Sequence, residues 1–195
     1  MTRTFFEKTT ASAAYPVTVS DCKTQSRIVS SADDTYLQAL IRTAEQYAES
    51  YTGRALLTST YKLYLNQFPS TIVVPRSPLV ALTSIKYNDN DGAEQTLDAS
   101  KYTLHKLERP FIVPAYGENW PATRSGMQAV TVEFTAGYGA AASDIPEGFR
   151  QALLFHVAHL YENREPDLIG TIISSIPNTL TALLNHWRIW EYHGE

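Results

Sequence analysis

The fold class of this chain is decided by residues 130–164, VTVEFTAGYGAAASDIPEGFRQALLFHVAHLYENR, where one hydrophobic period gives way to another. Val130, Val132 and Phe134 alternate with polar residues, and this period of two predicts a half-buried strand. After a glycine-rich break, residues 146–164 show the spacing of a long helix. A strand that leads directly into a long helix predicts an α+β protein.

The helix predicted for residues 146–164 is apolar on more than one side. From Phe149 to Tyr161 its only formal charge is Arg150, and Leu154, Ala158 and Tyr161 form a second apolar stripe. A helix that is apolar nearly all round is buried on several sides. The second stripe is covered either by the rest of the domain or by neighbouring subunits of an assembly.

An earlier amphipathic helix is predicted over residues 33–52. Its apolar residues recur at steps of three and four, with Glu45 and Glu49 on the opposite, polar side. Asp33 or Asp34 can cap the first turn, and Gly53 follows the last periodic residue, where a left-handed cap is common. A shorter helix is expected to begin near residue 20.

A small antiparallel sheet is predicted between the two long helices. The strand candidates are residues 61–65, 71–74, 82–87, 101–106, 111–113 and 130–135. Asp91-Gly92 favours a type I′ hairpin turn, and this explains the acidic segment 89–92 better than a calcium loop does. We expect a single domain over residues 1–195, with helical parts 16–54 and 144–195 and a β subdomain 55–137.

Composition restricts the possible function classes. The 195 residues include 20 acidic and 16 basic side chains, and the net charge of -4 lacks the cationic footprint of a nucleic-acid binder. The single cysteine, Cys22, excludes an internal disulfide framework. No segment has the apolar length of a signal peptide or a membrane span. We therefore expect a soluble protein that is made inside the cell and has no membrane partner.

The best candidates for a metal site are His156 and His159, followed by Glu162. Each step of three residues lags by about 60° on an α-helix, so Glu162 points about 120° away from His156. The sequence therefore predicts no catalytic residue, no metal site and no cofactor. A metal-dependent hydrolase that uses the two histidines remains an alternative.

The end of the chain is rich in aromatic residues. Residues 179–190 predict a further helix, and Trp187, Trp190 and Tyr192 crowd its end, where a monomer rarely has spare core to receive them. The cluster therefore either packs in the core or forms an interface. A second alternative is a β-sheet ligand-binding module whose platform would comprise Tyr116, Trp120 and Tyr138.

Several segments, in their order along the chain, resemble the head-tail connector (adaptor) family of long-tailed phages and gene transfer agents. The early segments are Pro16-Val17 with Lys23, residues 48–56 (AESYTGRAL), and residues 79–87 with the Asp91-Gly92 turn. The more specific segments are residues 114–124 (PAYGENWPATR), 134–139 (FTAGYG), 145–147 (IPE), 150–153 (RQAL), 159–164 (HLYENR), Leu183-Leu184 and 188–190 (RIW). Cys22, Ser26 and residues 165–176 depart from the pattern.

The resemblance implies a helical adaptor core with a small antiparallel β-sheet insertion between the first long helix and the second. It implies a structural virion protein, assembled in the host cytoplasm, that forms a dodecameric ring in the head-tail neck. The ring would join the portal protein to a stopper or tail-proximal neck protein and form part of the DNA channel, with DNA as a passing, non-specific occupant. The family has no catalytic residues to carry over.

We expect two surfaces to act in assembly. The docking surface toward the portal or a neighbouring subunit comprises Leu183, Leu184, Trp187, Arg188 and Trp190. The subunit-packing surface comprises Leu154, Ala158 and Tyr161. We expect truncation after Pro177 to leave a folded protein that no longer joins purified heads.

Overall fold

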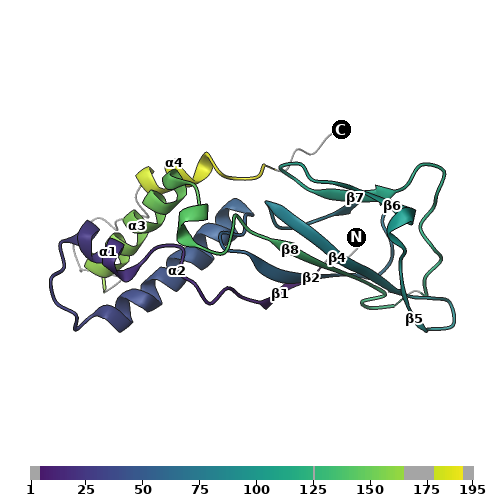
Figure 1. Ribbon diagram of the computed structural model, residues 1–195, viewed down its shortest axis with the longest axis horizontal. Helices are drawn as coiled ribbons and strands as arrows, with labels where there is room; N and C mark the ends of the chain where they lie inside the picture. The colour runs from purple at the N-terminus through teal and green to yellow at the C-terminus, as the bar shows by residue number, and fades with distance from the viewer. Residues whose placement is uncertain (1–4, 125, 165–177, 191–195) are drawn as a thin grey trace, which may run out of the picture. The chain divides into compact units, whose positions relative to one another are not determined.

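A computed structural model describes residues 5–124, 126–164 and 178–190. The chain divides into two compact units, which we call the β unit (residues 1–12 and 58–138) and the helical unit (residues 13–57 and 139–195). Figure 1 shows strands in the first and helices in the second. The α+β prediction is thus confirmed, whereas a single adaptor domain over residues 1–195 stays a prediction.

The β unit contains two antiparallel sheets. The five-stranded sheet has the order β1-β2-β8-β4-β5, and the three-stranded sheet has the order β3-β7-β6. Lys106, just after β6, donates from Nζ to the carbonyl of Val80 in β4 at 2.6 Å, which ties the two sheets together. The strands are β1 (Phe5–Thr10), β2 (Ser59–Leu65), β3 (Ile72–Val73), β4 (Leu79–Asn88), β5 (Glu94–Thr96), β6 (Tyr102–His105), β7 (Phe111–Pro114) and β8 (Val130–Ala136), with a 3-10 turn η1 (Ala99–Lys101) before β6.

The core of the β unit follows from the period of two. In β2 and β8, buried residues alternate strictly with half-buried ones, as their sequences predict. Tyr61 pairs with Phe134 across the strands, and their rings stack with centroids 5.4 Å apart. Ile72 and Ile112, which are paired in the three-stranded sheet, are also fully buried. One face of each sheet therefore supplies the hydrophobic core.

Sequence periodicity missed two strands and one turn. The edge strand β1 is mostly exposed, and β5 has three exposed residues, so neither has a buried stripe to reveal it. The prediction of a type I′ turn at Asp91-Gly92 is wrong. Such a turn needs a positive φ at both central residues, and Gly92 has a φ of 86° whereas Asp91 has no positive φ. Asp89 pairs with Ala93 instead, and its carboxylate accepts from the N–H groups of Asp91 and Ala93. The Asp89 carboxylate is therefore engaged in this longer turn, whereas a calcium loop would need it as a metal ligand.

The helical unit contains α1 (Val19–Ser26), α2 (Asp34–Thr52), α3 (Glu147–Glu162) and α4 (Asn178–Asn185), with a 3-10 turn η2 (Ala142–Asp144) before α3. Gly53 closes α2 in the left-handed conformation, with φ of 74°, as predicted. Gly139 lies against η2, and a Cβ added there would collide with the side chain of Asp144. The glycine-rich break between strand and helix is thus a site of close packing.

The predicted polar face of α2 is partly wrong. Glu45 and Glu49 are both buried rather than exposed. Arg42 pairs with Glu45 at 2.8 Å, and Glu49 Oε1 accepts from the backbone N–H of Leu56 at 3.0 Å. Burial of these carboxylates is stabilised by specific partners. Glu49 thereby fixes the path of the chain as it leaves α2.

The stacked pair in the β core gives a test of this fold. We expect Phe134→Ala to lower the free energy of unfolding by about 3–5 kcal/mol, because it leaves a cavity beside Tyr61 in a fully buried layer. Urea denaturation followed by fluorescence measures the change. Tyr116→Ala is the control, because this ring is fully exposed and its loss should cost less than about 0.5 kcal/mol. Equal losses in the two variants would contradict the assignment of the core.

Candidate assembly surface

The helix α3 is covered on several sides within its own unit. It packs against α1, α2 and α4. Of the three residues expected to pack against another subunit, Leu154 is buried, and Ala158 and Tyr161 are half-buried. The second apolar stripe is therefore largely occupied by intramolecular contacts. The large apolar side chain that α3 leaves exposed is Phe155.

A polar clasp joins the end of α3 to the start of α2. Tyr161 donates its hydroxyl to Asp33 Oδ2 at 2.6 Å, and Arg164 donates to the same oxygen at 3.2 Å. The Arg164 guanidinium also lies over the rings of Tyr36 and Tyr161. The hydrogen bond from Tyr161 lowers the pKa of Asp33 and raises that of the phenol. Asp33 makes no capping bond to its own helix, in contrast to the sequence prediction.

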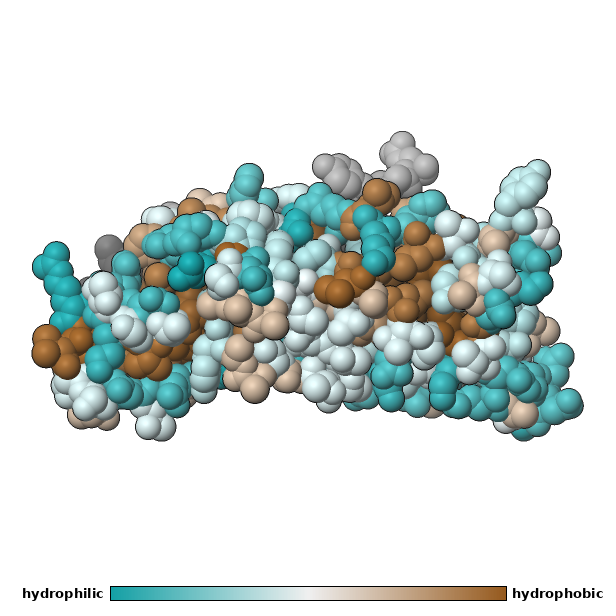
Figure 2. All heavy atoms as spheres, viewed as in Figure 1, coloured by the Kyte–Doolittle hydropathy of each residue, from teal (hydrophilic) through white to brown (hydrophobic). Residues whose placement is uncertain are grey.

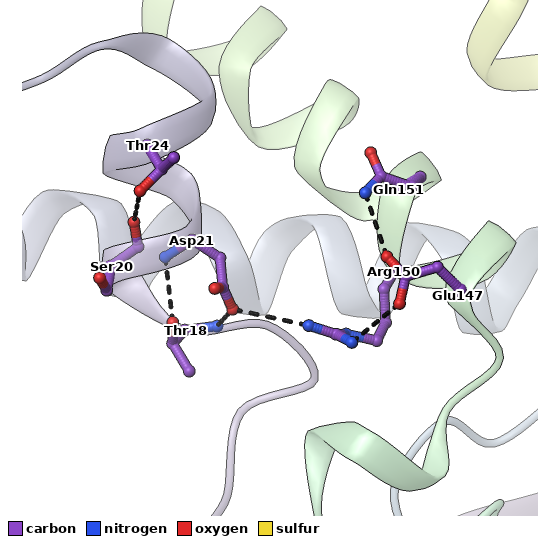
Figure 3. Close-up of polar contacts among 7 residues, drawn as sticks. All are labelled: Thr18, Ser20, Asp21, Thr24, Glu147, Arg150 and Gln151. Carbon is purple, nitrogen blue, oxygen red and sulfur yellow. Dashed lines mark hydrogen bonds and ion pairs between the residues drawn. The ribbon is translucent and has the colours of Figure 1, made fainter.

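A second set of polar contacts holds α1 against the start of α3 (Figure 3). Thr18 and Asp21 form a capping box, in which each side chain accepts from the backbone N–H of the other. The bond from the Thr18 N–H is the main cause of the lowered pKa of Asp21. Arg150 pairs with Glu147 at 2.9 Å and reaches Asp21 at 3.9 Å. The one charge in the apolar part of α3 thus serves packing between helices.

The C-terminal segment is tied to the end of α2 by three hydrogen bonds. Tyr51 donates its hydroxyl to Asn185 Oδ1 at 2.6 Å. The Ile189 N–H donates to the Thr52 carbonyl at 2.9 Å. Arg54 Nε donates to the Trp187 carbonyl at 2.5 Å. Two of these bonds fix the backbone on either side of Arg188, so the segment is held as part of the helical unit.

Hydrophobic contacts also fix this segment. Leu180 and Leu184 are almost fully buried, and the Trp187 ring packs against Gly148 and Phe149 of α3. Two of the five predicted docking residues, Leu184 and Trp187, therefore serve the core of the helical unit. Truncation after Pro177 would remove two almost fully buried leucines and uncover α3, so we now expect it to destabilise the helical unit.

Of the five residues predicted to dock, Arg188 and Trp190 are exposed and Leu183 is half-buried. Trp190 retains 53% of its accessible surface. The Arg188 guanidinium lies 5.1 Å from the centre of the Tyr51 ring and 4.7 Å from that of Trp190. On the face drawn in Figure 2, several separate hydrophobic patches lie among polar residues. An exposed tryptophan beside a cation resembles the anchors that dominate protein interfaces.

The predicted histidine pair has a packing role. His156 is buried, and its ring meets Tyr47 of α2 edge to face at 4.9 Å. Burial, with a smaller effect of the nearby His159, lowers the pKa of His156 to about 4. Among the described residues, no three His, Cys, Asp or Glu side chains gather closely enough to hold a metal ion. The geometry of these residues therefore offers no support for the metal-dependent hydrolase.

Trp120 is not free to take part in the aromatic platform that was predicted to bind a ligand. Trp120 stacks on Phe68 with ring centroids 4.8 Å apart and planes 5° from parallel, whereas Tyr116 is fully exposed. Trp120 is thus engaged in packing of the β unit rather than free to stack on a ligand.

Across the described residues, no helix has the length and apolar character to cross a membrane.

The fold defines an α+β protein, and most of its candidate site residues are engaged in packing. Residues 16–103 match the family model of phage gp6-like head-tail connector proteins. This match includes α1, α2, the strands β2 to β5 and the start of β6. No protein with a curated functional description matches the sequence.

Solved structures extend the likeness to nearly the whole chain. A chain from the neck of an empty gene transfer agent (GTA) particle, computed with C6 symmetry, is 26% identical and superposes with a TM-score of 0.81. Chains from a native GTA virion and from a native neck computed with C12 symmetry have TM-scores of 0.80 and 0.74, at 26% and 25% identity. Each comparison covers 98% of both chains. The resemblance to head-tail connector proteins is thus confirmed.

The two roles within the C-terminal segment can be separated by mutation. We expect Leu184→Ala to lower the free energy of unfolding by about 2–5 kcal/mol, because its side chain is 1% exposed. Trp190→Ala should cost less than about 1 kcal/mol, since mainly its contact with Arg188 is lost. Thermal and urea denaturation measure both. A large loss of stability in Trp190→Ala would show that this ring belongs to the core.

Burial of His156 predicts a pH-dependent stability. The unfolded imidazole takes up its proton near pH 6.5 and the folded one near pH 4, so the unfolded state binds more protons between these values. The neutral ring therefore contributes as much as about 3 kcal/mol above pH 6.5, and this contribution disappears as the pH falls toward 4.

Denaturant titrations between pH 4 and 7 should show a shallower pH dependence in His156→Gln than in the parent chain. The control is His186→Gln, because His186 is exposed and its loss should leave the parent's pH dependence unchanged. An identical slope in His156→Gln and the parent would contradict the burial of a neutral His156.

Proposed function

We propose that this chain is a head-tail adaptor, a structural and non-catalytic virion protein of the neck of a tailed phage or gene transfer agent. The observation that carries this proposal is the likeness over 98% of both chains to neck proteins of GTA particles. The match of residues 16–103 to head-tail connectors supports the same role from sequence alone.

The assembly we propose is a ring of twelve copies around the DNA channel. The related necks were computed with C6 and C12 symmetry, and twelve copies satisfy both. A ring requires each copy to present two different surfaces, because its interfaces are head-to-tail. Phe155 on α3 and Val29 between α1 and α2 are exposed apolar side chains of the helical unit that are available for such contacts.

The docking surface we propose for the portal protein consists of Arg188 and Trp190, supported by Leu183, while Leu184 and Trp187 hold it in place. The opposite partner would be a stopper or tail-proximal neck protein. DNA would pass through the ring without being held, because an acidic chain with a net charge of -4 provides little attraction for phosphates.

The test uses a producing strain from which the gene has been deleted. We expect heads that package DNA but do not join tails, because the adaptor links portal and tail. Adding the purified parent chain to these heads should restore tail joining and add a ring of density below the portal in electron micrographs. Trp190→Ala, which retains the fold, should restore less. Normal tailed particles from the deletion strain would overturn the proposed function.

A further inference from the structure

Arg188 differs from six other basic residues of the described chain in the groups that contact it. Lys23, Arg42, Lys86, Lys101, Arg150 and Arg164 each form an ion pair with a carboxylate. Arg188 is exposed, and among residues 5–124, 126–164 and 178–190 no carboxylate pairs with it. Its guanidinium lies instead between the rings of Tyr51 and Trp190.

This arrangement orients the guanidinium without neutralising it. The rings contact the guanidinium through their faces, and this leaves its N–H groups available at its edge, because a guanidinium donates in its own plane. The backbone on both sides is fixed by the bonds from Ile189 to Thr52 and from Arg54 to Trp187. Less conformational entropy is therefore lost when a ligand binds Arg188 than when it binds a free arginine.

The aromatic surroundings continue along α2. Tyr47 stacks on Tyr51 with ring centroids 5.9 Å apart, and both rings are half-buried. A partner that reaches Arg188 therefore also meets the faces and edges of Tyr51, Tyr47 and Trp190. Such a surface suits an anionic group carried on an apolar or aromatic segment of a protein.

We propose that Arg188 binds a carboxylate of the neck partner on which the C-terminal segment docks, with Tyr51 and Trp190 packing against the apolar residues beside that carboxylate. This inference rests on the proposed function, in which the partner is the portal protein. A planar guanidinium matches a carboxylate in two-point geometry. A DNA phosphate fits less well, because a phosphate-binding surface needs several cations and the chain carries a net charge of -4.

The experiment measures binding of the full-length chain to purified portal rings by biolayer interferometry, at salt concentrations from about 50 to 500 mM. We expect Arg188→Gln to weaken binding about tenfold at low salt and to reduce the dependence on salt. Arg188→Lys should lie between Arg188→Gln and the parent, because it keeps the charge and loses the planar geometry. Arg27→Gln is the matched control, since Arg27 is an exposed arginine of the same unit.

Portal rings whose carboxyl groups have been converted to amides test the ligand itself, after electron microscopy confirms that the rings are intact. The parent chain should lose affinity for these rings, and Arg188→Gln should lose little more. Equal portal binding by Arg188→Gln and the parent would overturn the carboxylate proposal while leaving docking intact. The proposal would also be overturned if Arg188→Gln impaired only self-association, measured in the ultracentrifuge, or only DNA binding. If the parent chain does not bind portal rings at all, the proposed function fails with it.

Discussion

Helix α3 is apolar on most of its circumference, and the helical unit is organised around covering it. The pair of Arg150 and Asp21 holds α1 to the start of α3. The bond from Tyr161 to Asp33 joins the end of α3 to the start of α2. The C-terminal segment covers the remaining side with Leu180, Leu184 and Trp187. Residues from both ends of the sequence are therefore needed to bury one helix. This constraint explains why the last described residues are bonded to α2.

The elements with a strong hydrophobic period were predictable from sequence. The helix of residues 33–52 and the strands around Tyr61 and Phe134 were predicted because their buried residues repeat at the spacing of their own backbone. The edge strands β1 and β5 have no such repeat, because an edge strand with little buried surface needs no apolar stripe. Features that depend on tertiary contacts could not be predicted from the sequence. Glu45 and Glu49 are buried because Arg42 and the Leu56 N–H receive them.

The candidate surface was only partly predictable for the same reason. A cluster of aromatic residues near the chain terminus indicated an interface, but sequence could not divide it into residues that face inward and outward. That division follows from tertiary contacts, in which Trp187 packs against Phe149 and the bond from Ile189 to Thr52 sets the direction of the last described residues. Trp187 packs inward as a result, and Trp190 faces outward. Tyr51, which supports Arg188, carried no signal of this role in sequence.

The distribution of charge bears on the proposed passage of DNA. Ion pairs within the described residues neutralise cations on α1, α2, α3 and the β unit. Such pairs attract a phosphate backbone weakly, because each carboxylate offsets its neighbouring cation within a Debye length. Arg188 is held differently, since aromatic faces contact it and carry no net charge that would offset its own. In the proposed function DNA passes through the ring while a protein partner binds, and this requires the cation that docks to be distinct from the surface that DNA meets.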